Sequence, residues 1–100
     1  MKTIYIRTET QKEAITRAEW LYKILRDNTP VIADLHMLKA EVQTENVLVR
    51  YVPKSFVTDG IRCDIAVGFG QLSRIMTGKN ECYDLYNDKE IAKFIVEEEM

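Results

Sequence analysis

The sequence contains few of the residues on which catalytic and metal sites usually depend. Its 100 residues include one histidine, His36, and two cysteines, Cys63 and Cys82, with no C-x-x-C pair. None of the three falls at a recognised zinc-ligand spacing. A cysteine–histidine nucleophilic pair would need a lowered thiol pKa and supporting geometry, and the sequence indicates neither. We therefore expect no metal, no cofactor and no enzymatic activity.

Long apolar runs and a dominant charge are missing as well. No run approaches the roughly 20 apolar residues that span a bilayer, and no stretch reads as a signal peptide. The 14 basic and 16 acidic side chains leave a net charge of -2. Because Lys and Arg are scattered rather than striped, direct binding to nucleic acid or to a membrane is disfavoured. Together with the few cysteines, this predicts a reducing, intracellular location, the cytoplasm.

What the chain does contain is typical of a globular protein. Apolar residues make up 46% and charged residues 30% of the sequence, close to the average for folded domains. At this length a chain builds one core. We expect residues 1–100 to form a single compact domain.

The first third predicts a strand followed by a full-length helix. The segment "KTIYIRT" alternates Ile4 and Ile6 on one face, as a half-buried strand does. Thr10 and Glu13 then form a capping box at a helix start, and the helix ends at "DNTP" because the residue before a proline avoids helical geometry. One apolar stripe runs along this helix: Ala14, Ala18, Leu21 and Leu25, flanked by Ile15 and Tyr22.

The middle third is partly ambiguous. Residues 30–43 fit either a helix with Pro30 at its first position or a strand, and we favour a strand at their start. A hairpin spans residues 42–52, with a polar "TEN" turn in which Asn46 tolerates a left-handed backbone. The outer edge of this hairpin offers a surface for self-association into a homo-oligomer across a twofold axis.

The last third predicts a short strand over residues 61–67, a brief helix that Gly78 closes, and a helix that starts at Asn87 with Glu90 three residues later. We expect Ile91, Phe94 and Ile95 to face inward. The fold class is therefore α/β (or α+β): a small mixed sheet with an N-terminal βαβ unit, a central β-hairpin and helices packed on the sheet.

Two further residues of the predicted 61–67 strand have ordinary structural interpretations. Cys63 lies in an apolar segment and fits an inert, buried thiol. Asp64 points to the opposite face and is expected to pair with Arg62 or Arg50.

The stretch "GIRCDIAVGFGQLS" most resembles a binding site. A strand, a glycine-rich turn and a helix start match the first two glycines of the dinucleotide pattern G-x-G-x-x-G. If the 61–67 strand is a parallel neighbour of the first strand, the ends of both strands meet at this turn. A phosphorylated ligand would then be bound by Thr8, Thr10, Gly68, Phe69, Gly70, Gln71 and Ser73. The alternative is a tight turn in which glycine supplies a positive φ angle.

A second group of residues suggests contact with a partner. Trp20 falls off the apolar stripe of the first helix, where an exposed tryptophan suits an interface, although it could instead cover the edge of the core. The segment "ECYDLYN" presents tyrosines among acidic residues. The last helix carries acidic residues at its C-terminus, where the helix macrodipole disfavours negative charge. Both patterns suggest contact with a partner. These candidate partner-binding residues are Trp20, Tyr83, Asp84, Tyr86, Glu97, Glu98 and Glu99.

Two functional hypotheses follow. In the first, the protein is a non-enzymatic module that docks a folded surface onto another protein or a nucleoprotein. Small phage-type inhibitors of host nucleoprotein enzymes, including CRISPR effectors, have this profile, and the acidic side chains would compete for a cationic channel. In the second, the Gly68–Gly70 turn binds a nucleotide or another phosphorylated small molecule.

Overall fold

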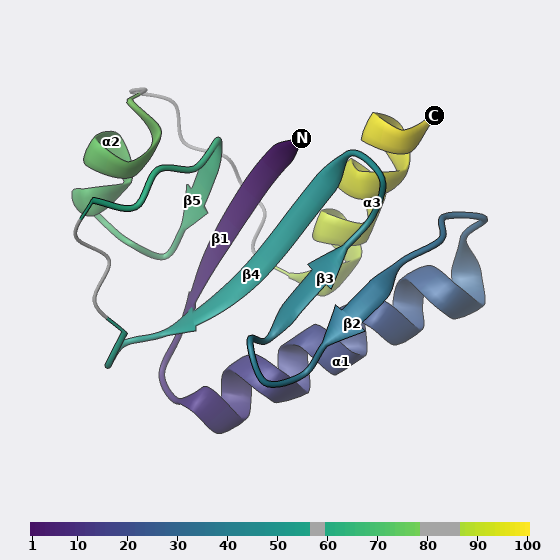
Figure 1. Ribbon diagram of the computed structural model, residues 1–100, viewed down its shortest axis with the longest axis horizontal. Helices are drawn as coiled ribbons and strands as arrows, with labels where there is room; N and C mark the ends of the chain where they lie inside the picture. The colour runs from purple at the N-terminus through teal and green to yellow at the C-terminus, as the bar shows by residue number, and fades with distance from the viewer. Residues whose placement is uncertain (57–59, 79–86) are drawn as a thin grey trace.

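The computed structural model describes residues 1–56, 60–78 and 87–100. Five strands form one mixed sheet with three helices packed on it, which confirms the predicted α/β class (Figure 1). The sheet order is β2-β3-β4-β1-β5. The elements are β1 (Lys2–Thr8), α1 (Gln11–Asn28), β2 (Asp34–His36), β3 (Glu41–Gln43), β4 (Val47–Pro53), β5 (Ile65–Val67), α2 (Leu72–Thr77) and α3 (Asp88–Glu99).

The centre of the sheet is parallel and one side is antiparallel. β1 pairs in parallel with both β4 and β5, whereas β2, β3 and β4 are antiparallel neighbours. β2 therefore runs in the same direction as β1, with α1 connecting them. This is the predicted βαβ unit, although β3 and β4 lie between its two strands.

Residues 30–43 contain strands rather than a helix. β2 and β3 are joined by a turn in which Ala40 has a φ of 49°. The Ala40 amide donates to the Met37 carbonyl at 3.0 Å, and the Ala40 carbonyl accepts from the Tyr51 amide at 3.0 Å. Ala40 is thus buried with its backbone hydrogen bonds made, which stabilises an unusual conformation. The left-handed backbone predicted for Asn46 is wrong, because Asn46 is not among the described residues with positive φ.

The predicted hairpin of residues 42–52 exists, but its strands are not an edge. β3 lies between β2 and β4, and β4 lies between β3 and β1. The expectation that this hairpin offers a free edge for self-association is therefore wrong. The free edges of the described sheet are β2 and β5, each three residues long.

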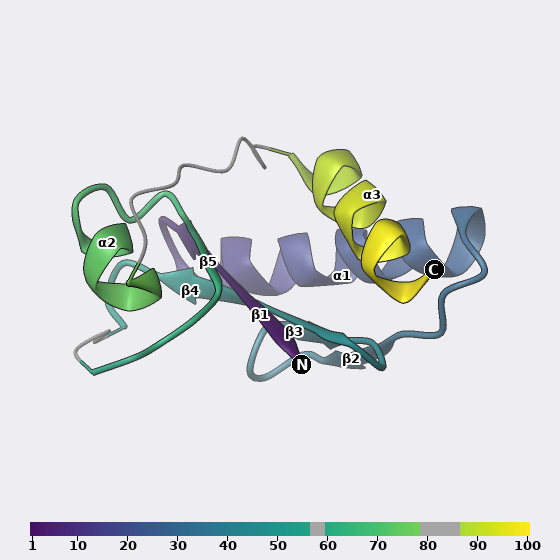
Figure 2. The same ribbon diagram turned by 90° about the horizontal axis from the view of Figure 1, so that it is seen from above.

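The main core lies between one face of the sheet and two helices. α1 and α3 both cover this face (Figure 2). The predicted stripe of α1 is entirely buried, as are Ile91 and Ile95 of α3, while Phe94 packs against the core from its margin. Both predicted helix caps form. The Thr10 hydroxyl accepts from the Glu13 amide at 3.1 Å, and the Asn87 side chain accepts from the Glu90 amide at 3.0 Å.

A smaller cluster forms on the opposite face of the sheet. Tyr5 of β1 and Ala66 of β5 are paired neighbours whose side chains point away from the main core. Both pack against the smaller cluster. Its buried members are Val52, Cys63, Phe69 and Met76. The predicted 61–67 strand is shorter than expected, because the Cys63 amide donates to the Met76 carbonyl at the end of α2 rather than to β1. Among the described residues, no helix combines the length and hydropathy that crossing a bilayer would require.

Candidate functional site: the glycine bend and the α1–α3 groove

The structure places the predicted glycine bend beside the end of β1. Because β5 is a parallel neighbour of β1, the bend that follows β5 lies against the end of β1. Gly68 has a φ of +81° and Gly70 a φ of +59°. A Cβ at Gly68 would lie only 3.3 Å from the Cβ of Arg7. Glycine is therefore needed at position 68 both for the positive φ and for the close approach.

The hydroxyls of the predicted site, and the Ser73 amide, are hydrogen-bonded within the fold. The Ser73 hydroxyl and amide both donate to the Gly70 carbonyl, at 2.7 and 3.2 Å. The Thr8 hydroxyl donates to the Thr10 carbonyl at 3.1 Å, and the Thr10 hydroxyl caps α1. Phe69 is buried in the smaller cluster, and its ring centroid lies 5.3 Å from the Arg7 guanidinium carbon. The helix that follows, α2, has six residues, and its N-cap Gln71 makes no side-chain capping bond. This geometry fits a backbone reversal.

His36 and Cys63 do not meet. His36 lies on the edge strand β2, and Cys63 precedes the opposite edge strand β5, with three strands between them. Burial and the neighbouring Asp64 carboxylate raise the pKa of the Cys63 thiol. Cys82 lies outside the described residues. Across residues 1–56, 60–78 and 87–100, no group of three or more His, Cys, Asp or Glu side chains could hold a metal ion.

The expected pairing of Asp64 with a nearby arginine is wrong. The Asp64 carboxylate accepts from the Thr3 amide at 2.8 Å and from the Thr3 hydroxyl at 3.3 Å, which ties β1 to the start of β5. Arg50 instead pairs with Glu41 at 3.7 Å, and the Arg62 guanidinium donates to the Ile75 carbonyl. Asp64 therefore has a structural role in sheet pairing.

A groove of about 480 Å³ opens between the C-terminal half of α1 and the face of α3 beside it. Its apolar residues come from both helices and from the loop that follows α1. Its charged residues are two exposed lysines of α3. The lining residues are Ile24, Asn28, Thr29, Pro30, Lys89, Ala92, Lys93 and Val96.

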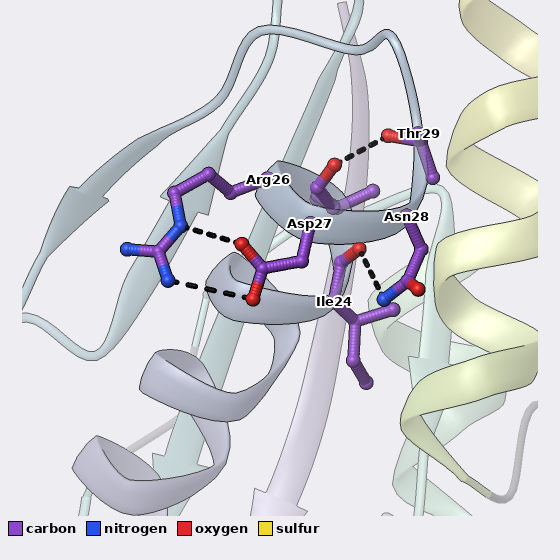
Figure 3. A network of polar contacts seen from close by, with 6 residues as sticks. Ile24, Arg26, Asp27, Asn28 and Thr29 are labelled. Atoms are coloured by element: carbon purple, nitrogen blue, oxygen red, sulfur yellow. Dashed lines mark hydrogen bonds and ion pairs between the residues drawn. The ribbon is translucent and has the colours of Figure 1, made fainter.

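The end of α1, which lines this groove, is held by side-chain hydrogen bonds (Figure 3). The Thr29 hydroxyl donates to the Leu25 carbonyl at 2.7 Å and accepts from the Val31 amide at 3.2 Å. The Asn28 side-chain amide donates to the Ile24 carbonyl at 3.2 Å. These bonds satisfy carbonyls that a helix end leaves free, so the chain itself fixes the conformation of this wall of the groove.

Three side chains hold α3 beside α1. The Asp88 carboxylate at the start of α3 accepts from the Tyr51 hydroxyl at 2.9 Å and from the Arg17 guanidinium at 3.2 Å. Burial, together with the Asp88 carboxylate, raises the pKa of Tyr51 above its ordinary value of 10.0. The hydroxyl therefore stays protonated as a donor, and α1, β4 and α3 meet at one carboxylate.

Trp20 is an exposed residue of α1 near the groove residue Ile24 in the sequence. It is 60% exposed and sits one helical turn before Ile24, on the same flank of α1. Arg17, three residues before Trp20, contacts α3 directly. Trp20 is therefore largely exposed, on a flank of α1 that it shares with Arg17 and Ile24.

Of the other predicted partner-binding residues, two glutamates of α3 are engaged within the fold. Glu98 pairs with Lys2 at 3.2 Å. Glu99 accepts from the Asn46 amide at 2.8 Å and from the Thr44 hydroxyl, and these bonds lower the pKa of Glu99. Glu97 is exposed. Tyr83, Asp84 and Tyr86 lie outside the described residues.

Sequence reasoning missed the groove, although part of its signal was available. Lys89 and Lys93 are four residues apart, with Ala92 and Val96 on the same helical face. The position of Ile24 opposite them depends on how α1 packs against α3, which no local pattern reveals. In comparisons with known proteins, the chain matches no family model and has no significant match among curated proteins or solved structures.

Proposed function

We propose that this protein is a binding module that acts in the cytoplasm by docking onto a protein or nucleoprotein partner. The surface that docks comprises Trp20 and the residues that line the α1–α3 groove, and we call it the α1–α3 face. The observation that carries this proposal is the exposed Trp20 one helical turn before Ile24, which lines an apolar groove together with Ala92 and Val96. Inhibition of a nucleoprotein enzyme, in the manner of small phage-type inhibitors, is the specific activity that we propose for such docking.

The chemistry of this face supports a binding role. Large aromatic side chains give interfaces much of their free energy, particularly when they lie at a well-packed apolar centre. Trp20 supplies such an anchor, and the groove beside it supplies apolar surface that a partner would remove from water. The wall at Thr29 and the contact at Asp88 hold this surface in one conformation, and a preorganised surface loses less conformational entropy on binding.

Site-specific photo-crosslinking tests the proposal. A photoreactive phenylalanine analogue replaces Trp20 in one variant, and Arg62, exposed and outside the α1–α3 face, in a matched control. After irradiation in a lysate of the cells that make the protein, we expect one macromolecule to be captured from position 20 and not from position 62. That macromolecule, once purified, should bind the wild-type protein and lose at least about tenfold in affinity for Ile24→Glu, which is 1.4 kcal/mol.

Circular dichroism of Ile24→Glu establishes that the variant is folded. If position 20 captures nothing beyond what position 62 captures, or if the purified partner binds Ile24→Glu as well as wild type, docking through this face is wrong. If the captured partner is an enzyme, its activity is measured with and without the purified protein. A lower activity in the presence of the protein indicates inhibition, and an unchanged activity indicates simple tethering.

A further inference from the structure

We infer that the α1–α3 groove binds an acidic amphipathic helix of the partner. This inference rests on the proposed docking function and adds the chemical nature of the segment that is bound. It follows from the charge of the groove, the apolar surface along it, and the state of the backbone in its walls.

The charge of the groove is of one sign. The two ionisable side chains that line it are Lys89 and Lys93, and neither forms an ion pair with another residue in the part of the chain that the structure describes. They lie four residues apart on α3, so their ammonium groups repel each other weakly. Carboxylates of a partner, spaced about 6 Å apart along its axis, would neutralise both charges and remove this repulsion.

The apolar surface follows the helix axes. Ala92 and Val96 repeat at a spacing of four on α3, and Ile24 lies opposite them on α1, one turn after Trp20. A partner that contacts this strip must present its own apolar residues at helical spacing. Helices that lay such a face into a groove are a recurrent mode of peptide recognition.

The backbone of the walls excludes strand addition. Both long walls of the groove are helices, whose peptide groups are hydrogen-bonded internally. An extended peptide would find no ladder of free N–H and C=O groups here, and its own would remain unpaired against apolar side chains. A helix forms its backbone hydrogen bonds internally. It therefore leaves fewer N–H and C=O groups unpaired in this groove than an extended peptide would.

The surroundings of the groove predict at which end of α3 the acidic residues of the partner lie. At the C-terminal end of α3, an adjoining hollow is lined by Glu45 and Glu99 together with Pro30, Ile32 and Met100. Glu99 is already bound by Thr44 and Asn46. Acidic residues of the partner should therefore lie at the Lys89 end of α3 and not at the Glu99 end.

Stapled helical peptides test this inference directly, because a staple removes the instability of short isolated helices. Three fluorescent peptides of about 15 residues share one apolar stripe. The first has two glutamates flanking the stripe near one end, the second has lysines there, and the third has the glutamates at the other end. Anisotropy titrations at about 0.01 M and 1 M salt compare them. We expect the first peptide to bind at least about tenfold more tightly than the lysine peptide at low salt, with most of that advantage lost at high salt.

Two charge-reversal variants complete the experiment. Lys89→Glu/Lys93→Glu should reverse the preference, so that the lysine peptide binds more tightly. Lys12→Glu/Lys39→Glu, which changes the net charge equally at exposed positions outside the groove, should keep it. Crosslinking from the labelled peptides reports the orientation: the glutamate end should reach residues at the start of α3.

Several results would overturn the inference: no binding of the acidic peptide, equal binding of the glutamate and lysine peptides, or a preference that survives Lys89→Glu/Lys93→Glu. Sedimentation that shows a dimer lost in this variant would assign the groove to a second copy instead. A partner captured from position 20 whose contact segment lacks an acidic helix would leave docking intact and refute this inference alone. Peptide selectivity without any such captured partner would refute the proposed function alone.

Discussion

The Arg17 guanidinium lies over the ring of Tyr51, 4.9 Å from its centroid, while both side chains contact the same oxygen of Asp88. Arg17 belongs to α1, Tyr51 to β4 and Asp88 to α3, so one carboxylate joins three elements that are far apart in the sequence. Asp88 is directly followed by Lys89, the first lysine of the groove. The position of α3, and with it the width of the groove, depends on this contact.

Removing the Tyr51 hydroxyl should weaken this junction. Tyr51 is buried, and its hydroxyl donates to a charged acceptor, an interaction worth about 1.5–3 kcal/mol. We expect Tyr51→Phe to lower the free energy of unfolding in urea by an amount in this range. Tyr22→Phe is the matched control, because Tyr22 is half-buried on α1 and no hydrogen bond of its hydroxyl is found in the described residues. It should change stability by less than about 0.5 kcal/mol, and equal losses in both variants would contradict the account.

The two glycines of the bend should tolerate alanine differently. Both have positive φ, which costs a residue with a Cβ roughly 1–2 kcal/mol. At Gly68 the new methyl group would also lie 3.3 Å from the Arg7 Cβ, whereas at Gly70 nothing lies within 4 Å. Gly68→Ala should therefore lower the thermal midpoint more than Gly70→Ala does. The reverse order would contradict the explanation that position 68 requires glycine because of its close approach to β1.

Acid should weaken the attachment of the C-terminus to the β3–β4 turn. Hydrogen bonds from Thr44 and Asn46 lower the pKa of Glu99 below its ordinary value of 4.5. The stability that these bonds contribute is fully present above that ordinary value, and it disappears as the pH falls through the lowered pKa. The stability difference between wild type and Glu99→Gln should be largest near neutral pH and vanish in strong acid.

Glu97→Gln serves as the control for this pH dependence, because it neutralises an exposed carboxylate on the same helix. Urea denaturation across the acidic range measures both variants. A Glu99→Gln profile parallel to that of the wild type at every pH would contradict the assignment of these hydrogen bonds.

The glycine bend should bind no nucleotide. Its hydroxyls and the Ser73 amide are engaged within the fold, and α2 is a short helix. A ligand at 100 times its dissociation constant would add about 2.7 kcal/mol of stability, so a panel of nucleotides should leave the melting temperature unchanged. An upward shift that disappears in Ser73→Ala would instead establish a phosphate site at this bend.

Local patterns predicted the elements well where the signal lies within one helix or strand. The stripe from Ala14 to Leu25 and the caps at Thr10 and Asn87 follow from residue spacing alone, and the structure confirms them. The left-handed residue was misplaced because Ala40, rather than Asn46, has its φ fixed by tertiary hydrogen bonds and burial.

The groove could not be predicted from the sequence, because it also depends on tertiary contacts. Arg17 and Asp88 are far apart in the chain and become neighbours only when α1 and α3 cover the same face of the sheet. Patterns within a single helix identify its buried side, but they do not specify which second helix it meets. The sequence predicts that Trp20 lies off the apolar stripe, whereas the apolar groove between α1 and α3 is revealed only by the packed structure.

Amide chemical-shift mapping with the captured partner is the most direct measurement of the central claim. The 15N-labelled protein is titrated with the purified partner, and the perturbed amides are mapped on the fold. Docking through the α1–α3 face predicts that the largest changes occur at Trp20, Ile24, Ala92 and Val96. Changes confined to the β2 edge at residues 34–38, or to the glycine bend at residues 68–73, with α1 and α3 unaffected, would contradict it.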